Sequence, residues 1–285
     1  MDRLTVLSPA KLNLVLDVIK KRPDGFHELR TVFERISLAD RITLTPNAGG
    51  KIRVRCAQPQ VPQDSRNLAF KAAALLQDRF SIKEGLDINI TKNIPVAAGL
   101  AGGSSNAASV LMGLNRLWSL GLDTKQLVSY ASRIGSDVAF FLYDSSFALG
   151  TGRGEVIRPL KVQTKLWHVL VTPRVKMYTA EVFARLKLKL TNKKDNVNIL
   201  LPFLRTGDMK RLAGALSNDL EPVILSLRPD FLYLKRKLLD AGATGVCFSG
   251  SGPSVFALGR SQKHALSLRD KFDRRYNQVF VVSTL

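Results

Sequence analysis

The chain has 285 residues, of which 45% are hydrophobic and 23% are charged. This composition is typical of a globular protein with its own core, and the length predicts one or two domains. No apolar run approaches the roughly 20 residues of a membrane span, and the first residues lack a secretory signal pattern. The two cysteines, Cys56 and Cys247, lie far apart. We therefore expect reduced, buried thiols in a cytoplasmic protein, with neither a disulfide framework nor a zinc site.

The charge is less ordinary, because 43 Lys and Arg against 23 Asp and Glu give a formal net charge of +20. Such a field attracts polyanions, so nucleic-acid binding is one hypothesis. The basic residues are spread along the chain, with one concentration between Arg185 and Lys194, and no basic motif is interleaved with aromatic residues. This distribution favours the alternatives: a generally basic proteome, or a surface that suits a phosphorylated substrate.

In chain order, the first predicted element is a strand over residues 11–18. Leucines alternate there with other residues, so Lys11 and Asn13 share the face opposite Leu12 and Leu14. A turn follows in KKRPDGFHEL, with Pro-Asp-Gly as its signal. Further strands are expected over residues 36–44, 51–55 and 86–90, and a helix over 67–80.

The middle and end of the chain continue this mixture. Helical spacing begins near residue 107 and again near residue 123, and the character changes at about residue 156. Beyond that point we expect strands over 167–172, 255–258 and 279–282, with helices over 229–241 and 262–275. Mixed strands and helices of this kind predict an α+β fold. Because no flexible linker is present, two domains would be closely joined near residues 155–165.

The most informative segment is the Gly-rich run from Pro95 to Ser105. Gly99, Gly102 and Gly103 lie between a predicted strand and a predicted helix, and Ser104 opens that helix. Glycines let backbone N–H groups turn inward, and a helix N-terminus adds unpaired donors and partial positive charge. The simpler alternative is a helix cap after a glycine turn. Neither the Walker nor the Rossmann pattern is present. We predict a loop that holds phosphate.

Other residues allow two interpretations each. SGSGPS at residues 249–254 is a hairpin loop by default, although it could close over the same phosphates. Asp137 either caps a helix or, partly desolvated, accepts a hydroxyl proton and is kept ionised by a lysine. Lys11 is either a solvated strand residue or that lysine. His27 is either an exposed turn residue or a ligand contact. The three histidines have no metal-binding spacing, so no metal ligands are expected.

Three segments together resemble the motifs of the GHMP kinases, named for their galactose, homoserine, mevalonate and phosphomevalonate members. They are PAKLNL at 9–14, PVAAGLAGGSS at 95–105 and CFSGSGPSVFAL at 247–258. The resemblance implies an ATP-dependent small-molecule kinase that uses Mg²⁺. It also implies an N-terminal ATP-binding and catalytic domain of the ribosomal-protein-S5 domain-2 type, over residues 1–158. A ferredoxin-like C-terminal GHMP-type domain would cover residues 159–285.

Further segments resemble one branch of this family. They are PAKLNLVLDVIKKRPDGFHEL at 9–29, GSDVAFF at 135–141 and NDLE at 218–221. The resemblance implies that ATP phosphorylates the 2-hydroxyl of a cytidyl-diphosphate methylerythritol, on the non-mevalonate route to isoprenoid precursors. The alternatives are another GHMP kinase, acting on homoserine or mevalonate, and, more remotely, a basic nucleic-acid-binding protein. The expected partner is thus a small molecule, with no specific nucleic acid or membrane, in a monomer or weak homodimer.

The resemblance also implies residue roles. Asp137 would be the general base and Lys11 its cationic partner. The substrate-binding residues would be Asn13, Phe26, His27, Thr179 and Phe183. The ATP-binding residues would be Asn67, Pro95, Gly99, Leu100, Gly102, Gly103, Ser104 and Ser105. Phe26 replaces a frequent Tyr, which keeps ring stacking but loses a hydroxyl, and Ser136 replaces a frequent Ala.

Overall fold

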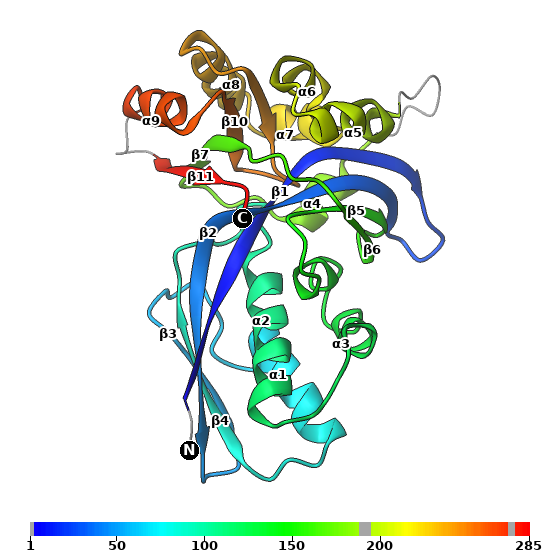
Figure 1. Cartoon of the computed structure of the whole chain (residues 1–285), viewed down its shortest axis with the longest axis vertical. Coiled ribbons are helices and arrows are strands. Elements are labelled where there is room, and N and C mark those ends of the chain that lie inside the picture. The colour runs from blue at the N-terminus through cyan, green and yellow to red at the C-terminus, as the bar shows by residue number, and fades with distance from the viewer. Residues whose placement is uncertain (1–2, 188–194, 273–276) are drawn as a thin grey trace. The chain divides into compact units, whose positions relative to one another are not determined.

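The computed structural model describes residues 3–187, 195–272 and 277–285, so part of the basic concentration, residues 188–194, lies outside the described residues. The chain forms two compact units that interleave in sequence (Figure 1). Unit 1 contains Met1–Ala10, Leu38–Val96 and Ala101–Asp144, and unit 2 contains Lys11–Ser37, Ala97–Leu100 and Ser145–Leu285. The long strands β1 (Leu4–Lys21) and β2 (His27–Asn47) therefore contribute residues to both units.

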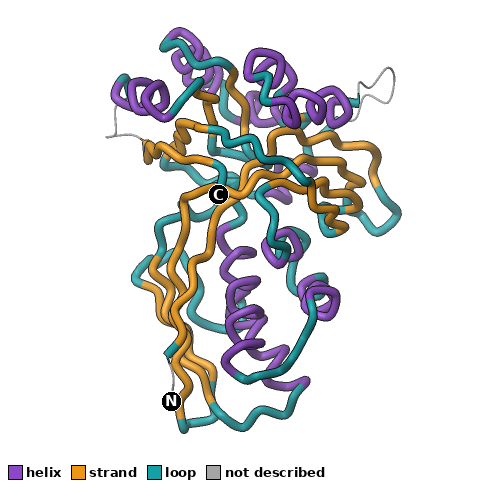
Figure 2. The backbone as a smooth tube through the Cα atoms, in the orientation of Figure 1, coloured by secondary structure: helices purple, strands orange, loops and turns teal. Residues whose placement is uncertain are grey.

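Unit 1 is a sheet with helices packed beside it (Figure 2). Its strand order is β3 (Ile52–Cys56), β4 (Gly85–Thr91), β2 and β1, with β3 parallel and β2 antiparallel to β4. The helices are α1 (Leu68–Arg79), α2 (Gly102–Leu117), α3 (Thr124–Ala131) and the short 3₁₀ helix η1 (Ala139–Leu142). Gly113 of α2 lies so close to β2 that a Cβ atom there would be 2.6 Å from the Leu44 side chain. This close packing fixes the helix that carries the predicted phosphate-holding residues.

Unit 2 contains the remaining halves of β1 and β2, together with β5 (Phe147–Gly152), β6 (Val156–Leu160) and β8 (Ser217–Asn218). A separate antiparallel sheet has the order β11 (Asn277–Ser283), β7 (Trp167–Pro173), β10 (Val255–Gly259) and β9 (Gly245–Phe248). Its helices are α4 (Thr179–Ala184), α5 (Asn196–Thr206), α6 (Met209–Ala215), α7 (Glu221–Leu227), α8 (Asp230–Asp240) and α9 (Gln262–Asp270).

A buried polar cluster holds the C-terminal residues inside unit 2. The carboxylate of Glu34 accepts a hydrogen bond from the Thr284 hydroxyl at 2.7 Å and lies 2.8 Å from Nε2 of His168. The Glu34 and His168 side chains are fully buried. Because a buried carboxylate is costly without partners, these contacts stabilise the attachment of the chain end to β2 and β7.

Most predicted elements are confirmed, and the α+β fold class with them. The helix predicted over 262–275 ends at Asp270, and residues 273–275 lie outside the described residues. The bounds predicted for the strand over residues 36–44 are wrong, because β2 runs unbroken from His27 to Asn47. Both cysteines are free and buried, and burial raises the pKa of Cys247 to about 12. Within the described part of the chain, no helix is long and apolar enough to cross a membrane. The boundary after residue 158 stays a prediction.

Candidate functional site

The N-terminus of α2 in unit 1 has the features of an anion site. The backbone N–H groups of Gly102, Gly103 and Ser104 lie in the first turn, where no carbonyl within the helix can accept them. The preceding residue, Ala101, adopts a left-handed conformation with φ +53° and has no side-chain oxygen to cap the helix. A non-glycine residue held in this conformation is strained, and such strain is common at functional loops. Unpaired donors and the helix dipole together favour a bound phosphate.

A buried carboxylate in unit 1 organises the approach to this helix. Asp40, which is fully buried, accepts hydrogen bonds at 2.8 Å from the backbone N–H groups of Asn93 and Ile94. It also accepts a hydrogen bond at 2.8 Å from the amide nitrogen of Asn106 in α2, and it pairs with the ammonium group of Lys92. One side chain thereby holds the segment that enters the Gly-rich run and the helix that leaves it.

The same network reaches the second serine of the run. The amide of Asn106 also lies 2.8 Å from the Ser8 hydroxyl, which donates to the Ser105 hydroxyl at 2.8 Å. Ser105 is fully buried, whereas Ser104 is half-buried. Of the two serines predicted to contact ATP, Ser104 therefore has the more accessible side chain, and Ser105 belongs to the buried network. Its role toward ATP stays a prediction.

In unit 2, the first strand holds a buried polar pair. The Lys11 ammonium donates to the side-chain oxygen of Asn13 at 2.5 Å, and the Asn13 amide donates to the Thr31 hydroxyl at 2.8 Å. Lys11 and Asn13 are only 4% and 2% exposed. The sequence correctly placed them on one face, but the interpretation of Lys11 as a solvated lysine is wrong. The Lys11 backbone N–H also donates to the Leu100 carbonyl at 3.2 Å, which ties this strand to the Gly-rich run.

The second Gly/Ser turn is more than a hairpin loop, because it packs against the middle of the Gly-rich run. The Ser249 hydroxyl donates to the Gly99 carbonyl at 3.0 Å. A Cβ atom on Gly99 would lie 2.1 Å from the Ser249 carbonyl oxygen, and Gly99 has φ +75°, so only glycine fits. The Cβ position of Gly250 lies 3.4 Å from the Asn13 side-chain oxygen and 3.5 Å from the Lys11 ammonium. The turn and Gly-rich run thus meet at the polar pair.

Side chains from the NDLE segment and from α4 hold this turn. The Asn218 amide, from the NDLE segment, donates to the carbonyl of Phe248 at 3.0 Å and to that of Gly250 at 2.8 Å. The Thr179 hydroxyl at the start of α4 lies 2.9 Å from the Ser251 hydroxyl. These contacts connect the turn to α4. They also bring together the SGSGPS turn and the NDLE segment, which the sequence had singled out separately.

Aromatic side chains gather near the turn at residues 22–27. The rings of His27 and Phe183 lie with centroids 5.1 Å apart and planes at 33°. The Phe26 ring does not join this pair; the guanidinium of Arg153 lies over it, 4.9 Å from the centroid. Burial, and to a smaller extent the charge of Lys21, lowers the pKa of His27 below 6.5. His27 is therefore neutral at pH 7, and its ring offers one donor and one acceptor.

The remaining predicted residues lie in unit 1. Asn67 caps α1: its side-chain oxygen accepts from the Ala69 N–H at 2.9 Å, and its amide donates to the Pro62 carbonyl at 2.6 Å. Any contact with adenine stays a prediction. Asp137 is half-buried and precedes η1, and Pro95 is buried. No group of three or more His, Cys, Asp or Glu side chains that could hold a metal occurs in residues 3–187, 195–272 and 277–285.

Sequence reasoning missed several residues of the site. They are Ser8, Asp40, Lys92, Asn106, Arg153 and Asn218. Asp40 had a signal, because a carboxylate within an otherwise alternating strand needs a partner when it is buried. The partners themselves lie 52 and 66 residues away, so spacing could not identify them.

Family models and known proteins point to the same family. The model of the GHMP kinases N terminal domain matches residues 67–145, and that of the GHMP kinases C terminal matches residues 200–278. The 4-diphosphocytidyl-2-C-methyl-D-erythritol kinase of Geobacillus thermodenitrificans (strain NG80-2) is 46% identical over 99% of this chain and 97% of its own length.

Solved structures agree with that result. A crystal structure of 4-(cytidine 5'-diphospho)-2C-methyl-D-erythritol kinase superimposes with a TM-score of 0.85 and 31% identity, over 98% of each chain. Homoserine kinase from Cytophaga hutchinsonii gives a TM-score of 0.80 at 22% identity, over 100% of this chain and 95% of its own. The second likeness concerns the fold alone.

The buried ion pair of unit 1 generates a prediction about stability. We expect Asp40→Asn to lower the free energy of unfolding by about 3–5 kcal/mol, because it leaves the buried Lys92 ammonium without its counter-charge. Urea denaturation measures the loss. The double variant Asp40→Asn/Lys92→Met removes both charges and should regain a large part of it. A single-variant loss below about 1 kcal/mol, the size of an ordinary substitution, would contradict this account.

Proposed function

The chain belongs to the GHMP kinase family, and we propose that it transfers the γ-phosphate of ATP to the 2-hydroxyl of 4-diphosphocytidyl-2-C-methyl-D-erythritol. Kinases of this family use ATP as co-substrate, so the chain is an ATP-dependent small-molecule kinase. The observation that carries the choice of acceptor is the contact between the tilted rings of His27 and Phe183, in the same unit as Lys11 and Asn13. The reaction would supply a phosphorylated intermediate to the non-mevalonate route to isoprenoid precursors.

The ATP phosphates are assigned to the N-terminus of α2. Its unpaired N–H groups and dipole are suited to the negative β- and γ-phosphates. Mg²⁺ is part of the proposal as the counter-ion of those phosphates. The residues present are compatible with this ion. The half-buried Ser104 hydroxyl, at the same helix N-terminus, is a hard oxygen ligand of the kind that Mg²⁺ accepts. When bound, the ion would offset charge on the transferred phosphate.

The acceptor is assigned to residues of unit 2. A nucleobase has flat faces and polar edges, which aromatic rings and a neutral imidazole can recognise. His27 and Phe183 would contact the cytosine, with Thr179 beside them, and Asn13 would orient the methylerythritol hydroxyls. Phe26 completes the substrate-binding set. Aromatic side chains placed for a base would have no purpose in a kinase for homoserine or mevalonate, which carry no base.

Asp137 is assigned as the general base and Lys11 as the cation that favours its ionised form. Asp137 would take the proton of the attacking hydroxyl, while the helix N-terminus stabilises charge on the phosphate. Lys11 and Asp137 belong to different compact units, so their pairing is carried by the family resemblance. The remaining assignments are contacts of Asn67, Pro95, Gly99, Leu100 and Gly102–Ser105 with ATP.

Further parts of the proposal concern the setting of the enzyme. We assign it to the cytoplasm, as a monomer or weak homodimer, without a specific nucleic-acid or membrane partner. We also retain the division into an N-terminal catalytic domain over residues 1–158 and a C-terminal domain over residues 159–285.

A panel of acceptors tests the proposed function. The enzyme is offered the cytidyl compound, homoserine and mevalonate in parallel with ATP and Mg²⁺, and phosphorus NMR identifies each product. We expect a new phosphomonoester signal with the cytidyl compound alone, because the other acceptors lack the base. Turnover of mevalonate or homoserine without turnover of the cytidyl compound would overturn the proposal.

Asp137→Ala tests the base. Because general bases contribute on the order of 10²–10⁴-fold, we expect kcat to fall by that factor while ATP still binds. Steady-state kinetics measures kcat, and titration calorimetry with a non-hydrolysable ATP analogue measures binding. Ser136→Ala, a change at the neighbouring position, serves as the control. Near-normal turnover by Asp137→Ala would contradict the assignment of Asp137 as the general base.

The lowered pKa of His27 predicts a pH dependence of acceptor binding. The ring is neutral at pH 7 and gains a proton only as the pH falls below 6.5, so the KM for the cytidyl acceptor should rise in that range. The KM for ATP should stay level, and His27→Gln, which cannot titrate, should lose the rise. An acceptor KM that is constant between pH 5 and pH 8 would contradict the role of His27.

A further inference from the structure

We propose that Arg153 is a positioning residue for the cytidyl acceptor, acting through Phe26. The inference rests on the proposed function, because it concerns how the acceptor is recognised. Arg153 lies at the tip of the β5–β6 hairpin, more than 120 residues from Phe26 in sequence. No motif that led to the family contains it.

The ring of Phe26 needs a neighbouring side chain to fix its orientation. It follows Gly25 in a turn, and 53% of its surface is exposed. An exposed ring on a turn samples several rotamers, so a ligand that stacks on it must first order it. The Arg153 guanidinium lies over the ring, 4.9 Å from its centroid, at cation–π distance. The guanidinium thereby covers part of the ring, while about half of the residue stays exposed for a ligand.

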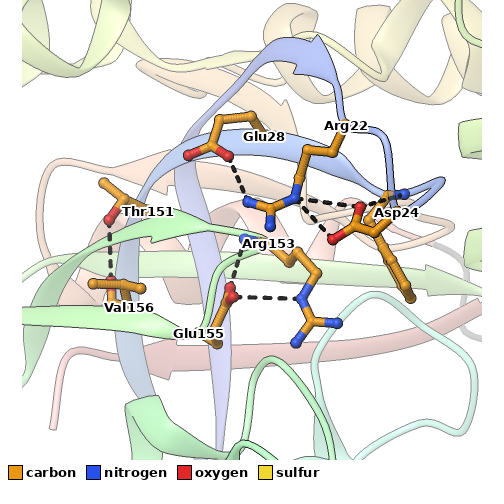
Figure 3. A network of polar contacts seen from close by, with 8 residues as sticks. Arg22, Asp24, Glu28, Thr151, Arg153, Glu155 and Val156 are labelled. Carbon is orange, nitrogen blue, oxygen red and sulfur yellow. Dashed lines mark hydrogen bonds and ion pairs between the residues drawn. The ribbon is translucent and has the colours of Figure 1, made fainter.

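Arg153 is itself held in place by its hairpin (Figure 3). Its backbone N–H donates to one carboxylate oxygen of Glu155 at 2.5 Å, and its Nε reaches the other at 3.4 Å. The hairpin is tight, since Gly152 and Gly154 both have positive φ, and the register pairs Thr151 with Val156. The guanidinium therefore projects from a short, rigid element rather than from a long loop.

The turn that carries Phe26 is fixed by a second arginine. Arg22 bridges the carboxylates of Asp24 and Glu28, with closest distances of 3.1 and 2.7 Å (Figure 3). Asp24 also accepts the Phe26 N–H at 3.1 Å, and the Arg22 N–H donates to the Phe26 carbonyl at 2.8 Å. The backbone of Phe26 is thus ordered, and the ring orientation is what remains for Arg153 to set.

The charge of Arg153 also acts on the turn that carries Phe26, in addition to the ring contact. Burial alone would raise the pKa of Asp24, but hydrogen bonds from the Phe26 amide and Arg22, with the charges of Arg22 and Arg153, lower it. The charge of Arg153 reaches Asp24 only as the smallest of these effects, so its contact with the turn is the one it makes with the Phe26 ring.

The ordering of the Phe26 ring by Arg153 should affect the binding of the acceptor. A ring ordered before binding spares the acceptor the entropy of ordering it, and this contribution is the same in the ground state and the transition state. Loss of Arg153 should therefore raise the acceptor KM, by roughly 3- to 10-fold for a partly exposed cation–π contact, and leave kcat unchanged. The KM for ATP should not change, because Arg153 is not assigned to the phosphate-holding helix.

Arg153→Ala is compared with Arg158→Ala, a matched control. Arg158 is an exposed arginine on β6 of the same hairpin, so its removal changes net charge equally without touching the Phe26 ring. Arg153→Lys keeps a cation but loses the planar fork and should give an intermediate acceptor KM. An unchanged acceptor KM in Arg153→Ala, or an equal rise in Arg158→Ala, would overturn the proposal.

A double-mutant cycle decides whether Arg153 acts through Phe26. If it does, Phe26→Leu and Phe26→Leu/Arg153→Ala should have the same acceptor KM, because the arginine has no ring left to position. Independent, multiplying effects would overturn the positioning role in favour of direct contact with the acceptor. The wild-type enzyme separates the two proposals: no turnover of the cytidyl compound refutes the function, whereas normal turnover with an unaffected Arg153→Ala refutes the inference alone.

Discussion

The close approach of Gly99 to Ser249 is the constraint on which the arrangement of unit 2 depends. Two backbones can come this near only where one residue lacks a Cβ atom, since a Cβ on Gly99 would lie 2.1 Å from a carbonyl oxygen. Because of this contact, the Gly-rich run and the Gly/Ser turn meet beside the buried pair of Lys11 and Asn13. Two segments 150 residues apart thereby meet at one buried polar pair.

A corresponding constraint in unit 1 is electrostatic rather than steric. Asp40 is buried with hydrogen-bond donors from the backbone, from Asn106 and from Lys92. A buried carboxylate is tolerated only when its oxygens are satisfied, and that requirement fixes the entry to the Gly-rich run against α2. The left-handed Ala101 can be held there because the segments on both sides of it are fixed.

Phosphate binding and base recognition make different demands on the chain. Phosphate can be bound by backbone N–H groups, which every sequence has, so the N-terminus of α2 needs little beyond glycines and an uncapped start. A base needs shaped side chains, and these come from elements that are distant in sequence, as in the pair of His27 and Phe183. The turn of residues 22–28 then requires its own scaffold of arginines and carboxylates, since it is short and exposed.

The sequence by itself determined most of the elements and the family, and it predicted the residues that are proposed to carry chemistry. Local patterns suffice for these: alternation placed Lys11 and Asn13 on one face, and the glycines of residues 99–103 indicated a phosphate loop. Tertiary structure alone decided which residues meet. It buried Lys11, used Asn67 as a helix cap, directed Ser105 into the network of Ser8, and paired Phe26 with Arg153 rather than with His27. The reason is that contacts between distant segments depend on sheet register and helix packing, which one stretch of sequence does not contain.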